Sequence, residues 1–289
     1  MLLKDKVCLV TGATAGIGLV TARELARLGA TTVVVSRNPE RCAAAVAGIQ
    51  QETGNPHVDF IAADLSSQAQ IRQLASTFQR RYAQLHVLVN NAGGYFLRRH
   101  KSIDGIEMTW ALNHLSYFLL TNLLLGTIQA SAPARIVNVS SGAHWDGRIN
   151  FDDLQCRGGN FGWTAYSQSK LANVLFTKEL ARRLEGSRVT VNALHPGFVA
   201  SNFAKNNGAL VRLAMRFAQI GAISPEEGAL TSIYLASSPE VEGVSGKYFY
   251  KGQEAPSNPA SDDLEIARRL WEISAEMTGL SGIQSSGAG

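Results

Sequence analysis

The fold is decided by the stretch Val7-Cys8-Leu9-Val10-Thr11-Gly12-Ala13-Thr14-Ala15-Gly16-Ile17-Gly18. It runs from a short apolar, β-branched segment through a glycine-rich turn into a helical pattern that continues to Leu28. Glycines let the backbone turn tightly and approach a pyrophosphate, whose charge is favoured by the free N–H groups and the dipole of a helix start. A tight turn without a ligand would show the same spacing, so other motifs must support this interpretation.

Similar apolar runs recur along the chain, with helical segments between them. They span residues 7–11, 31–36, 58–62, 86–90, 135–140 and 188–194. Continuous apolar runs are typical of strands buried on both faces, and their alternation with helices predicts an α/β fold. We expect a single-domain, Rossmann-type, doubly wound parallel sheet with helices on both faces, which binds ligands at the carboxyl ends of its strands.

One domain is expected over residues 1–281, because no linker divides the chain of 289 residues. Residues 201–224 interrupt the regular alternation and are predicted to form a lid on the substrate side. The small, polar residues 282–289 are predicted to be a disordered tail.

Composition argues against several classes of protein. A formal net charge of +4 without a long basic run gives little support to nucleic-acid binding. The three cysteines, Cys8, Cys42 and Cys156, have neither disulfide-framework nor metal-ligand spacing, so we predict no metal site and a reducing cytoplasm. No charged-plus-apolar signal peptide and no apolar run of roughly 18 residues is evident, so a transmembrane segment is not expected.

The end of the second predicted strand indicates which dinucleotide binds. A fold selective for NAD places a carboxylate there for the ribose 2′-OH, whereas this chain has Ser36 and Arg37. A hydroxyl and a guanidinium suit a 2′-phosphate. We therefore predict NADP(H) rather than NAD(H), with a solvated surface arginine as the alternative for Arg37.

Two further strand ends offer contacts to a dinucleotide. Asp64-Leu65 follows the third strand, where an adenine would lie, and Asn90-Asn91-Ala92-Gly93 follows the fourth. Both could instead be turns that end a strand.

Tyr166 and Lys170 are four residues apart in a helical segment and share one face. A free phenol has a pKa of about 10, and a neighbouring ammonium would lower that pKa toward the range useful for proton transfer. The pair alone is a common chance pattern. Two other residues support a site: Ser141 at the end of the fifth strand, suited to hydrogen-bonding a substrate oxygen, and Asn113, whose amide could hold a relay water. A strand-terminal cap and a core amide are the alternatives.

These motifs occur together in one known family. The chain combines Thr11-Gly12 with Gly16-Ile17-Gly18, Asp64-Leu65, Asn90-Asn91-Ala92-Gly93, Asn113, Ser141, Tyr166 with Lys170, and Pro196-Gly197. In this combination it resembles the short-chain dehydrogenase/reductase family over nearly its whole length. Asn113-His114-Leu115, Ser169-Lys170-Leu171-Ala172-Asn173 and His195-Pro196-Gly197 are similar to the retinol dehydrogenase and WW-domain oxidoreductase branch. The apolar N-terminal anchor of membrane-bound retinol enzymes is not seen here, which leaves the physiological substrate open.

The resemblance implies a role for each site residue. Ser141 would orient a carbonyl, Tyr166 would donate or accept the proton, Lys170 would hold the nicotinamide ribose and tune Tyr166, and Asn113 would complete a proton relay. The implied cofactor contacts are Gly12, Thr14, Ala15, Gly16, Ile17, Gly18, Ser36, Arg37, Asp64, Leu65, Asn91, Ala92, Gly93, Tyr166, Lys170, Pro196, Gly197, Val199 and Ser201.

Aromatic residues near these motifs predict an apolar substrate site. Tyr95, Phe96, Trp145 and Phe198, with Ser141, are expected to contact a small lipophilic carbonyl or alcohol, although several of the rings could be core residues. The lid carries Arg212 and Arg216 opposite apolar side chains, so peripheral membrane contact is an alternative to a simple mobile lid.

The resemblance also implies a homodimer or homotetramer built on the helices that hold Asn113 and Tyr166, and exposed Leu119, Leu123 or Phe176 would agree with it. We therefore expect a cytoplasmic, NADP(H)-dependent oxidoreductase acting on CH–OH and C=O groups. The alternatives are a non-catalytic dinucleotide sensor or scaffold, and a carbonyl-detoxifying reductase of broad specificity.

Overall fold

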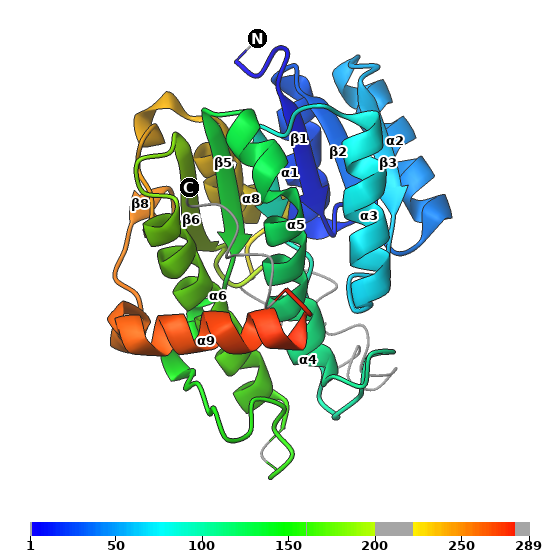
Figure 1. The fold of residues 1–289 in the computed structure, drawn as a ribbon. Coiled ribbons are helices and arrows are strands. Elements are labelled where there is room, and N and C mark those ends of the chain that lie inside the picture. The colour runs from blue at the N-terminus through cyan, green and yellow to red at the C-terminus, as the bar shows by residue number, and fades with distance from the viewer. Residues whose placement is uncertain (1, 160, 200–221, 281–289) are drawn as a thin grey trace.

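The computed structural model describes residues 2–159, 161–199 and 222–280, which form one α/β domain (Figure 1). Its sheet has the strand order β3-β2-β1-β4-β5-β6-β7-β8, parallel from β3 to β7 and closed by an antiparallel β8. The strands are β1 (Val7–Thr11), β2 (Thr31–Ser36), β3 (Val58–Ala62), β4 (Val87–Asn90), β5 (Ala134–Val139), β6 (Val189–His195), β7 (Tyr248–Tyr250) and β8 (Gln253–Glu254). The predicted doubly wound sheet is confirmed, and β7 and β8 are additions that the sequence pattern did not indicate.

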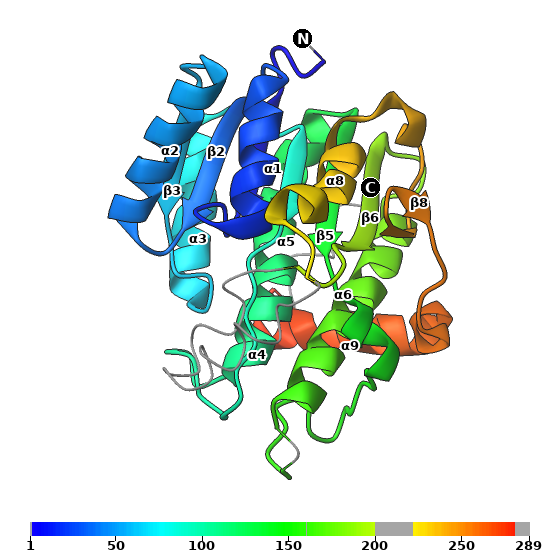
Figure 2. The same cartoon turned by 180° about the vertical axis from the view of Figure 1, so that it is seen from behind.

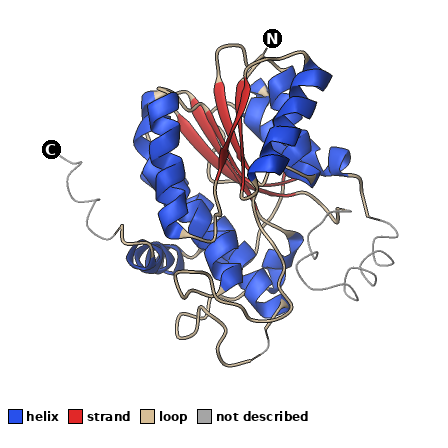
Figure 3. Ribbon diagram, turned by 90° about the vertical axis from the view of Figure 1, so that its right-hand side faces the viewer, coloured by secondary structure: helices blue, strands red, loops and turns tan. Residues whose placement is uncertain are grey.

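The helices cover both faces of this sheet (Figures 2 and 3). They are α1 (Gly16–Arg27), α2 (Pro39–Thr53), α3 (Gln68–Arg81), α4 (Met108–Trp110), a π-helical turn η1 (Ala111–Leu115), α5 (Ser116–Ala130), α6 (Trp163–Arg183), α8 (Pro225–Ser237) and α9 (Leu264–Met277), with 3₁₀ turns η2 (Gly142–Asp146), η4 (Pro239–Val241) and η5 (Pro259–Asp262). Leu9 of β1 packs with Leu74 and Phe176 on one face, while Val10 packs with Leu25 and Leu235 on the other. Burial on both faces explains the continuous apolar pattern of β1.

One helical stretch, Met108–Ala130, is long and apolar enough to cross a membrane. However, 67% of its most apolar window is buried inside the protein, which is the ordinary condition of a core helix. The predicted lid falls largely on residues 200–221 and the predicted tail on 282–289, which lie outside the described residues.

The glycine turn after β1 is packed against the end of β4. The amide Nδ2 of Asn91 donates to the carbonyl of Thr11 at 2.8 Å, and the hydroxyl of Thr11 accepts the backbone N–H groups of Asn91 at 2.8 Å and Ala92 at 3.0 Å. Gly12 has a φ of +67°, and a Cβ on Gly18 would overlap Asn91 Nδ2 and lie 2.5 Å from the carbonyl oxygen of Gly12. Glycine is therefore required at both positions by the protein's own backbone.

The C-terminal helix α9 crosses α6 and the helices that lead into α5 (Figure 1). Trp271 of α9 stacks on Phe176 at a centroid distance of 5.7 Å and meets Phe118 edge-on at 4.9 Å, while the guanidinium of Arg183 lies 4.2 Å from the Trp271 ring. Leu119 and Phe176 are consequently buried within the chain, and Leu123 is partly buried. Leu119 and Phe176 therefore lack the exposure that a subunit contact would need, whereas Leu123 keeps part of it.

We expect Gly18→Ala to destabilise the protein by about 1–3 kcal/mol, because the added methyl must displace Asn91 and the Gly12 carbonyl. The matched control is Gly48→Ala in the middle of α2, where a Cβ would meet nothing within 4 Å; it should stabilise by about 0.5–1 kcal/mol. Urea unfolding of both variants measures the difference, and an equal response would contradict the packing described for Gly18.

Trp271→Ala should lower the free energy of unfolding by about 3–5 kcal/mol, because it removes a buried aromatic ring from contact with Phe118 and Phe176. Leu264→Ala, on the same helix at a residue that is 54% exposed, should change it by less than about 0.5 kcal/mol. Chemical denaturation of the two variants makes the comparison, and a small effect of Trp271→Ala would mean that α9 is not part of the cooperative core.

Candidate active site

The candidate site lies at the carboxyl ends of β1, β4, β5 and β6, where the strand order changes direction between β1 and β4. Parallel sheets leave a crevice at such a point, because the connections leave to opposite faces. The predicted catalytic residues come from three places around it: Asn113 from η1, Ser141 from the segment after β5, and Tyr166 and Lys170 from α6. The structure brings these four together.

Tyr166 occupies the first turn of α6, and its hydroxyl is hydrogen-bonded to Ser141. The residue is 6% exposed. Burial raises the pKa of the Tyr166 phenol above its usual value, and the Ser141 hydrogen bond lowers that pKa in part. Ser141 also caps η2 by accepting the N–H of Ala143 at 3.2 Å. The capping role that was the alternative for Ser141 therefore coexists with its contact to Tyr166.

Lys170 lies one turn further along α6, with its Nζ 5.7 Å from the centre of the Tyr166 ring. Nζ donates to the carbonyl of Val139, the last residue of β5, at 3.0 Å. Burial lowers the pKa of the Lys170 ammonium to about 7. The expected lowering of the Tyr166 pKa by Lys170 is thus not the dominant effect, because burial is the largest influence on both groups.

Asn113 lies in a π-helical turn rather than in the regular helix that the apolar pattern predicts. Its Oδ1 accepts the N–H of Gly94 at 2.8 Å, and its Nδ2 donates to the Gly94 carbonyl at 3.0 Å and to Ser169 Oγ at 3.1 Å. A Cβ on Gly93 would lie 3.2 Å from Asn113 Oδ1 and 3.6 Å from Lys170 Nζ. Because Gly93 has no side chain, its backbone can lie close to both of the groups that the predicted relay connects.

The first turn of α1 is suited to an anionic group. Its N-cap residue, Ala15, provides no side-chain hydrogen bond to the helix start, so the first N–H groups of the helix have no capping side chain. Thr14 Oγ1 donates to Ser36 Oγ at 3.2 Å, which ties the turn to the end of β2, and Arg37 is exposed directly beyond. The small residues and the uncapped helix start fit a dinucleotide.

The other predicted cofactor residues differ in their exposure and in the hydrogen bonds they make within the protein. Asp64 accepts the N–H and the hydroxyl of Ser66, at 2.9 and 2.8 Å, within the turn before α3, and Leu65 is buried. Asn91 is used to hold the glycine turn, and Ala92 is 8% exposed. Gly93 is exposed, as a contact residue must be.

The segment after β6 forms another wall. Gly197 has a φ of +89°, and a Cβ there would lie 2.9 Å from Ile223 Cδ1; its N–H donates to His195 Nδ1 at 3.0 Å. Pro196 immediately precedes it, and Val199 forms a parallel bridge with Ile223 beside Ile17 and Gly228. Ser201 lies outside the described residues.

Aromatic rings flank Tyr166. Tyr95 meets its ring edge-on at 5.6 Å, and Trp163, which the sequence analysis missed, lies 6.0 Å from it. Trp163 is 50% exposed and donates from Nε1 to Asp146 Oδ2 at 3.1 Å. Trp163 could have been predicted from the sequence, because it lies one helical turn before Tyr166. Of the other predicted contacts, Trp145 and Phe198 are about half exposed, whereas Phe96 is packed inside the protein.

A buried histidine, His144, contacts the backbone of Ser141 and was not predicted from the sequence. His144 Nδ1 lies 2.8 Å from the Ser141 carbonyl, and its Nε2 accepts the backbone N–H of Asn258 at 3.1 Å. The Asn258 amide donates to the carbonyls of His144, Trp145 and Gly147. Because Asn258 is far from this segment in sequence, no local pattern could reveal the contact.

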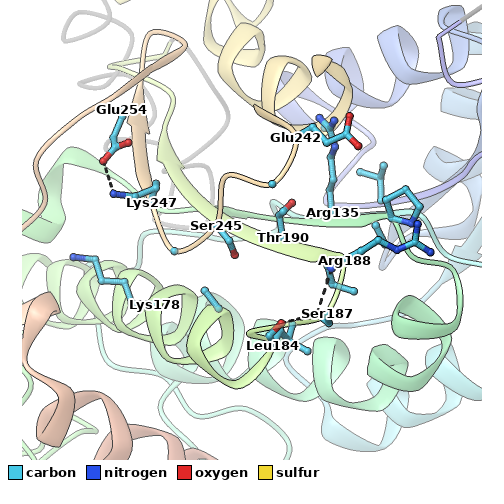
Figure 4. Close-up of a pocket in the computed structure, with 18 of the residues that line it drawn as sticks. Arg135, Lys178, Leu184, Ser187, Arg188, Thr190, Glu242, Ser245, Lys247 and Glu254 are labelled. Carbon is cyan, nitrogen blue, oxygen red and sulfur yellow. Dashed lines mark hydrogen bonds and ion pairs between the residues drawn. The ribbon is translucent and has the colours of Figure 1, made fainter. Parts of the chain in front are cut away.

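A cavity lined by both charged and apolar residues lies at the opposite ends of the strands, near the amino ends of β5 and β6 (Figure 4). Lys178, Arg188, Glu242 and Lys247 are among the residues that line it. Arg135 reaches from β5 to the carbonyls of Leu235 and Ser238 at the end of α8. None of the predicted catalytic residues lines this cavity, so it is separate from the candidate site.

Known proteins with this arrangement form one family. The sequence model of the family described as short chain dehydrogenase matches residues 6–210. Retinol dehydrogenase 13 of Homo sapiens is 45% identical over 282 residues, covering 95% of this chain and 85% of its own length. Polyprenol dehydrogenase of Homo sapiens is 43% identical over 285 residues, covering 96% and 86%.

Solved structures agree with the sequence relatives. A crystal structure of an uncharacterized protein from Mycobacterium paratuberculosis superimposes with a TM-score of 0.77 at 34% identity, covering 96% of this chain and 94% of that one. An active-site complex of RhlG from Pseudomonas aeruginosa with NADP has a TM-score of 0.68 at 29% identity, covering 86% and 94%. Since sequence, fold and site geometry coincide, the chain belongs to the short-chain dehydrogenase/reductase family, in its retinol dehydrogenase-like branch.

Proposed function

We propose that this protein is an NADP(H)-dependent oxidoreductase that interconverts a lipophilic carbonyl compound and its alcohol, with Tyr166 as the proton-transferring residue. Family membership makes it a nicotinamide-dependent oxidoreductase. The observation that carries the finer proposal is the buried Tyr166 hydroxyl, hydrogen-bonded to Ser141 and followed one turn later by Lys170.

The protonation of Tyr166 favours the reductive direction. Because burial raises the phenol pKa, the hydroxyl is protonated at neutral pH and is ready to donate to an oxygen that gains negative charge. A nicotinamide dinucleotide held at the glycine turn by residues such as Gly12 and Gly16 would supply the hydride. Ser141 donates a second hydrogen bond to the same oxygen, which stabilises the charge as it develops.

Lys170 is suited to return the proton. With its pKa lowered to about 7, the Lys170 ammonium can lose and regain a proton near neutral pH. Gly93 lets its backbone approach both Lys170 Nζ and Asn113 Oδ1 closely, and a water bound near these two groups would pass the proton onward. We assign Asn113 the role of holding that water.

Three observations support the choice of cofactor and substrate. Ser36 is held beside the glycine turn, and Arg37 follows it without an intervening carboxylate, which suits a 2′-phosphate. Tyr95 and Trp163 give the space beside Tyr166 aromatic walls, which suit an apolar molecule. The relatives named for retinol and polyprenol point to the same class of compound.

We also propose a cytoplasmic location, which is supported by three free, buried cysteines. The homodimer or homotetramer expected from the family would have to use a surface other than Leu119 and Phe176, because α9 covers that region. Peripheral membrane contact through residues 201–224 stays a proposal that rests on the sequence alone.

We expect Tyr166→Phe to lower kcat by about 100- to 10,000-fold, since it removes the proton donor, while the Kd for NADPH changes by less than about twofold. The assay is NADPH oxidation with retinal, steroid ketones, medium-chain aldehydes and aromatic ketones. A strong preference for one class indicates a dedicated enzyme, and similar rates across classes indicate a detoxifying reductase. Full turnover by the variant would contradict the role of Tyr166, and NADPH binding without any turnover by the natural protein would favour a sensor.

Arg37→Ala should weaken NADPH binding by roughly 10- to 100-fold, the loss expected for a charge-assisted contact with a phosphate, and should leave NADH binding nearly unchanged. Arg80→Ala on the exposed side of α3 serves as the control for removal of a surface arginine. Titration of protein fluorescence with each nucleotide gives both constants. Equal weakening of NADPH and NADH would reject the 2′-phosphate contact.

A further inference from the structure

We propose that Ser274, His114 and Asn173 form a hydrogen-bonded chain through which helix α9 positions the catalytic residue Asn113. The proposal rests on the function proposed above and adds three positioning residues to it. None of the three has a place in the hydride or proton transfer itself. They act on the reaction only by holding Asn113.

The chain of contacts is continuous and buried. Ser274 Oγ lies 2.9 Å from His114 Nε2, His114 Nδ1 lies 3.3 Å from Asn173 Oδ1, and Asn173 Nδ2 lies 2.9 Å from the backbone carbonyl of Asn113. His114, Asn173 and Asn113 are fully buried and Ser274 is 1% exposed. The chain joins α9, η1 and α6, three elements that are far apart in the sequence.

The direction of each hydrogen bond follows from the last one. Asn173 Nδ2 must donate to a carbonyl, so Asn173 Oδ1 is the acceptor and His114 Nδ1 carries the hydrogen. His114 Nε2 is then an acceptor, and the hydroxyl of Ser274 donates to it. Burial lowers the pKa of the imidazole to about 4, so His114 keeps this neutral form at physiological pH.

Asn173 binds the Asn113 carbonyl within the π-helical turn η1. A π-helical turn shifts backbone carbonyls away from their regular partners, so a carbonyl there is open to side-chain donors. The Asn113 side chain is held by Gly94 and Ser169, and its backbone is held by Asn173. Fixing both ends of the residue defines where Oδ1 lies relative to Lys170.

The imidazole ring is itself held in place by packing. Trp110 lies 4.7 Å from its centre and Phe176 meets it edge-on at 6.4 Å. Asn173 extends the network in the other direction, because its carbonyl accepts Thr177 Oγ1 at 2.8 Å and that hydroxyl oxygen accepts Asn138 Nδ2 of β5 at 2.9 Å. A polar path therefore runs from the sheet to α9 past Asn113.

The test uses Ser274→Ala and His114→Leu, with Ser232→Ala as the matched control. Ser232 is also a fully buried helical serine, and within the described residues its hydroxyl has no hydrogen-bond partner. We expect each test variant to lower kcat by about fivefold to tenfold, the loss expected for one hydrogen bond. KM and the Kd for NADPH should change by less than about twofold, and Ser232→Ala should change none of the three.

Amide hydrogen exchange at Gly94 gives a readout independent of activity. The Gly94 N–H donates to Asn113 Oδ1, so looser positioning of Asn113 should speed its exchange by a similar factor in both test variants and not in Ser232→Ala. Unchanged exchange at Gly94 would overturn the proposal. If no substrate turns over but exchange at Gly94 responds, the positioning chain stands and only the proposed function fails.

A combined variant separates positioning from general destabilisation. In the Asn113→Ala background, Ser274→Ala should lower kcat by less than about twofold further, because the side chain to be positioned is gone. If the two losses multiply in full, Ser274 does not act through Asn113 and the proposal is wrong.

Discussion

The structure depends on the contact between the end of β1 and the end of β4. There Asn91 donates two hydrogen bonds to Thr11 across the point where the sheet changes direction, and the packing leaves no room for a side chain at Gly12 or Gly18. This junction fixes the glycine turn on one side and the Gly93–Gly94 segment on the other. Because Gly94 holds Asn113 through two hydrogen bonds, the same junction also positions the π-helical turn.

Burial, rather than an ion pair, is the main influence on the pKa values of Tyr166 and Lys170 at the candidate site. Tyr166 and Lys170 are both shifted toward their neutral forms, and each is held by a neutral partner, Ser141 or the Val139 carbonyl. A site of this kind avoids the cost of a permanently buried charge.

The sequence predicted the sheet and named the four residues that the structure brings together, because their signals are local or occur as a set in one known family. The glycine turn, Tyr166 with Lys170, and the strand ends can each be recognised over a few neighbouring residues. The π-helical turn at Asn113 could not be predicted, because apolar spacing does not distinguish it from a regular helix. The contacts of His144 with Asn258 and of Trp163 with Asp146 depend on tertiary packing, which no single segment encodes.

The same limit explains why the surface of α5 and α6 was misjudged. Leu119 and Phe176 have the apolar character of an interface, but their partner is supplied by the same chain. Helix α9 places Trp271 on the apolar side of this contact and Ser274 on the polar side, where it meets His114. An apolar contact alone would tolerate small rotations of α9, whereas the directed hydrogen bond to His114 fixes one orientation. Packing therefore supplies the stability of this corner, and the buried polar chain fixes the position of the π-helical turn at Asn113.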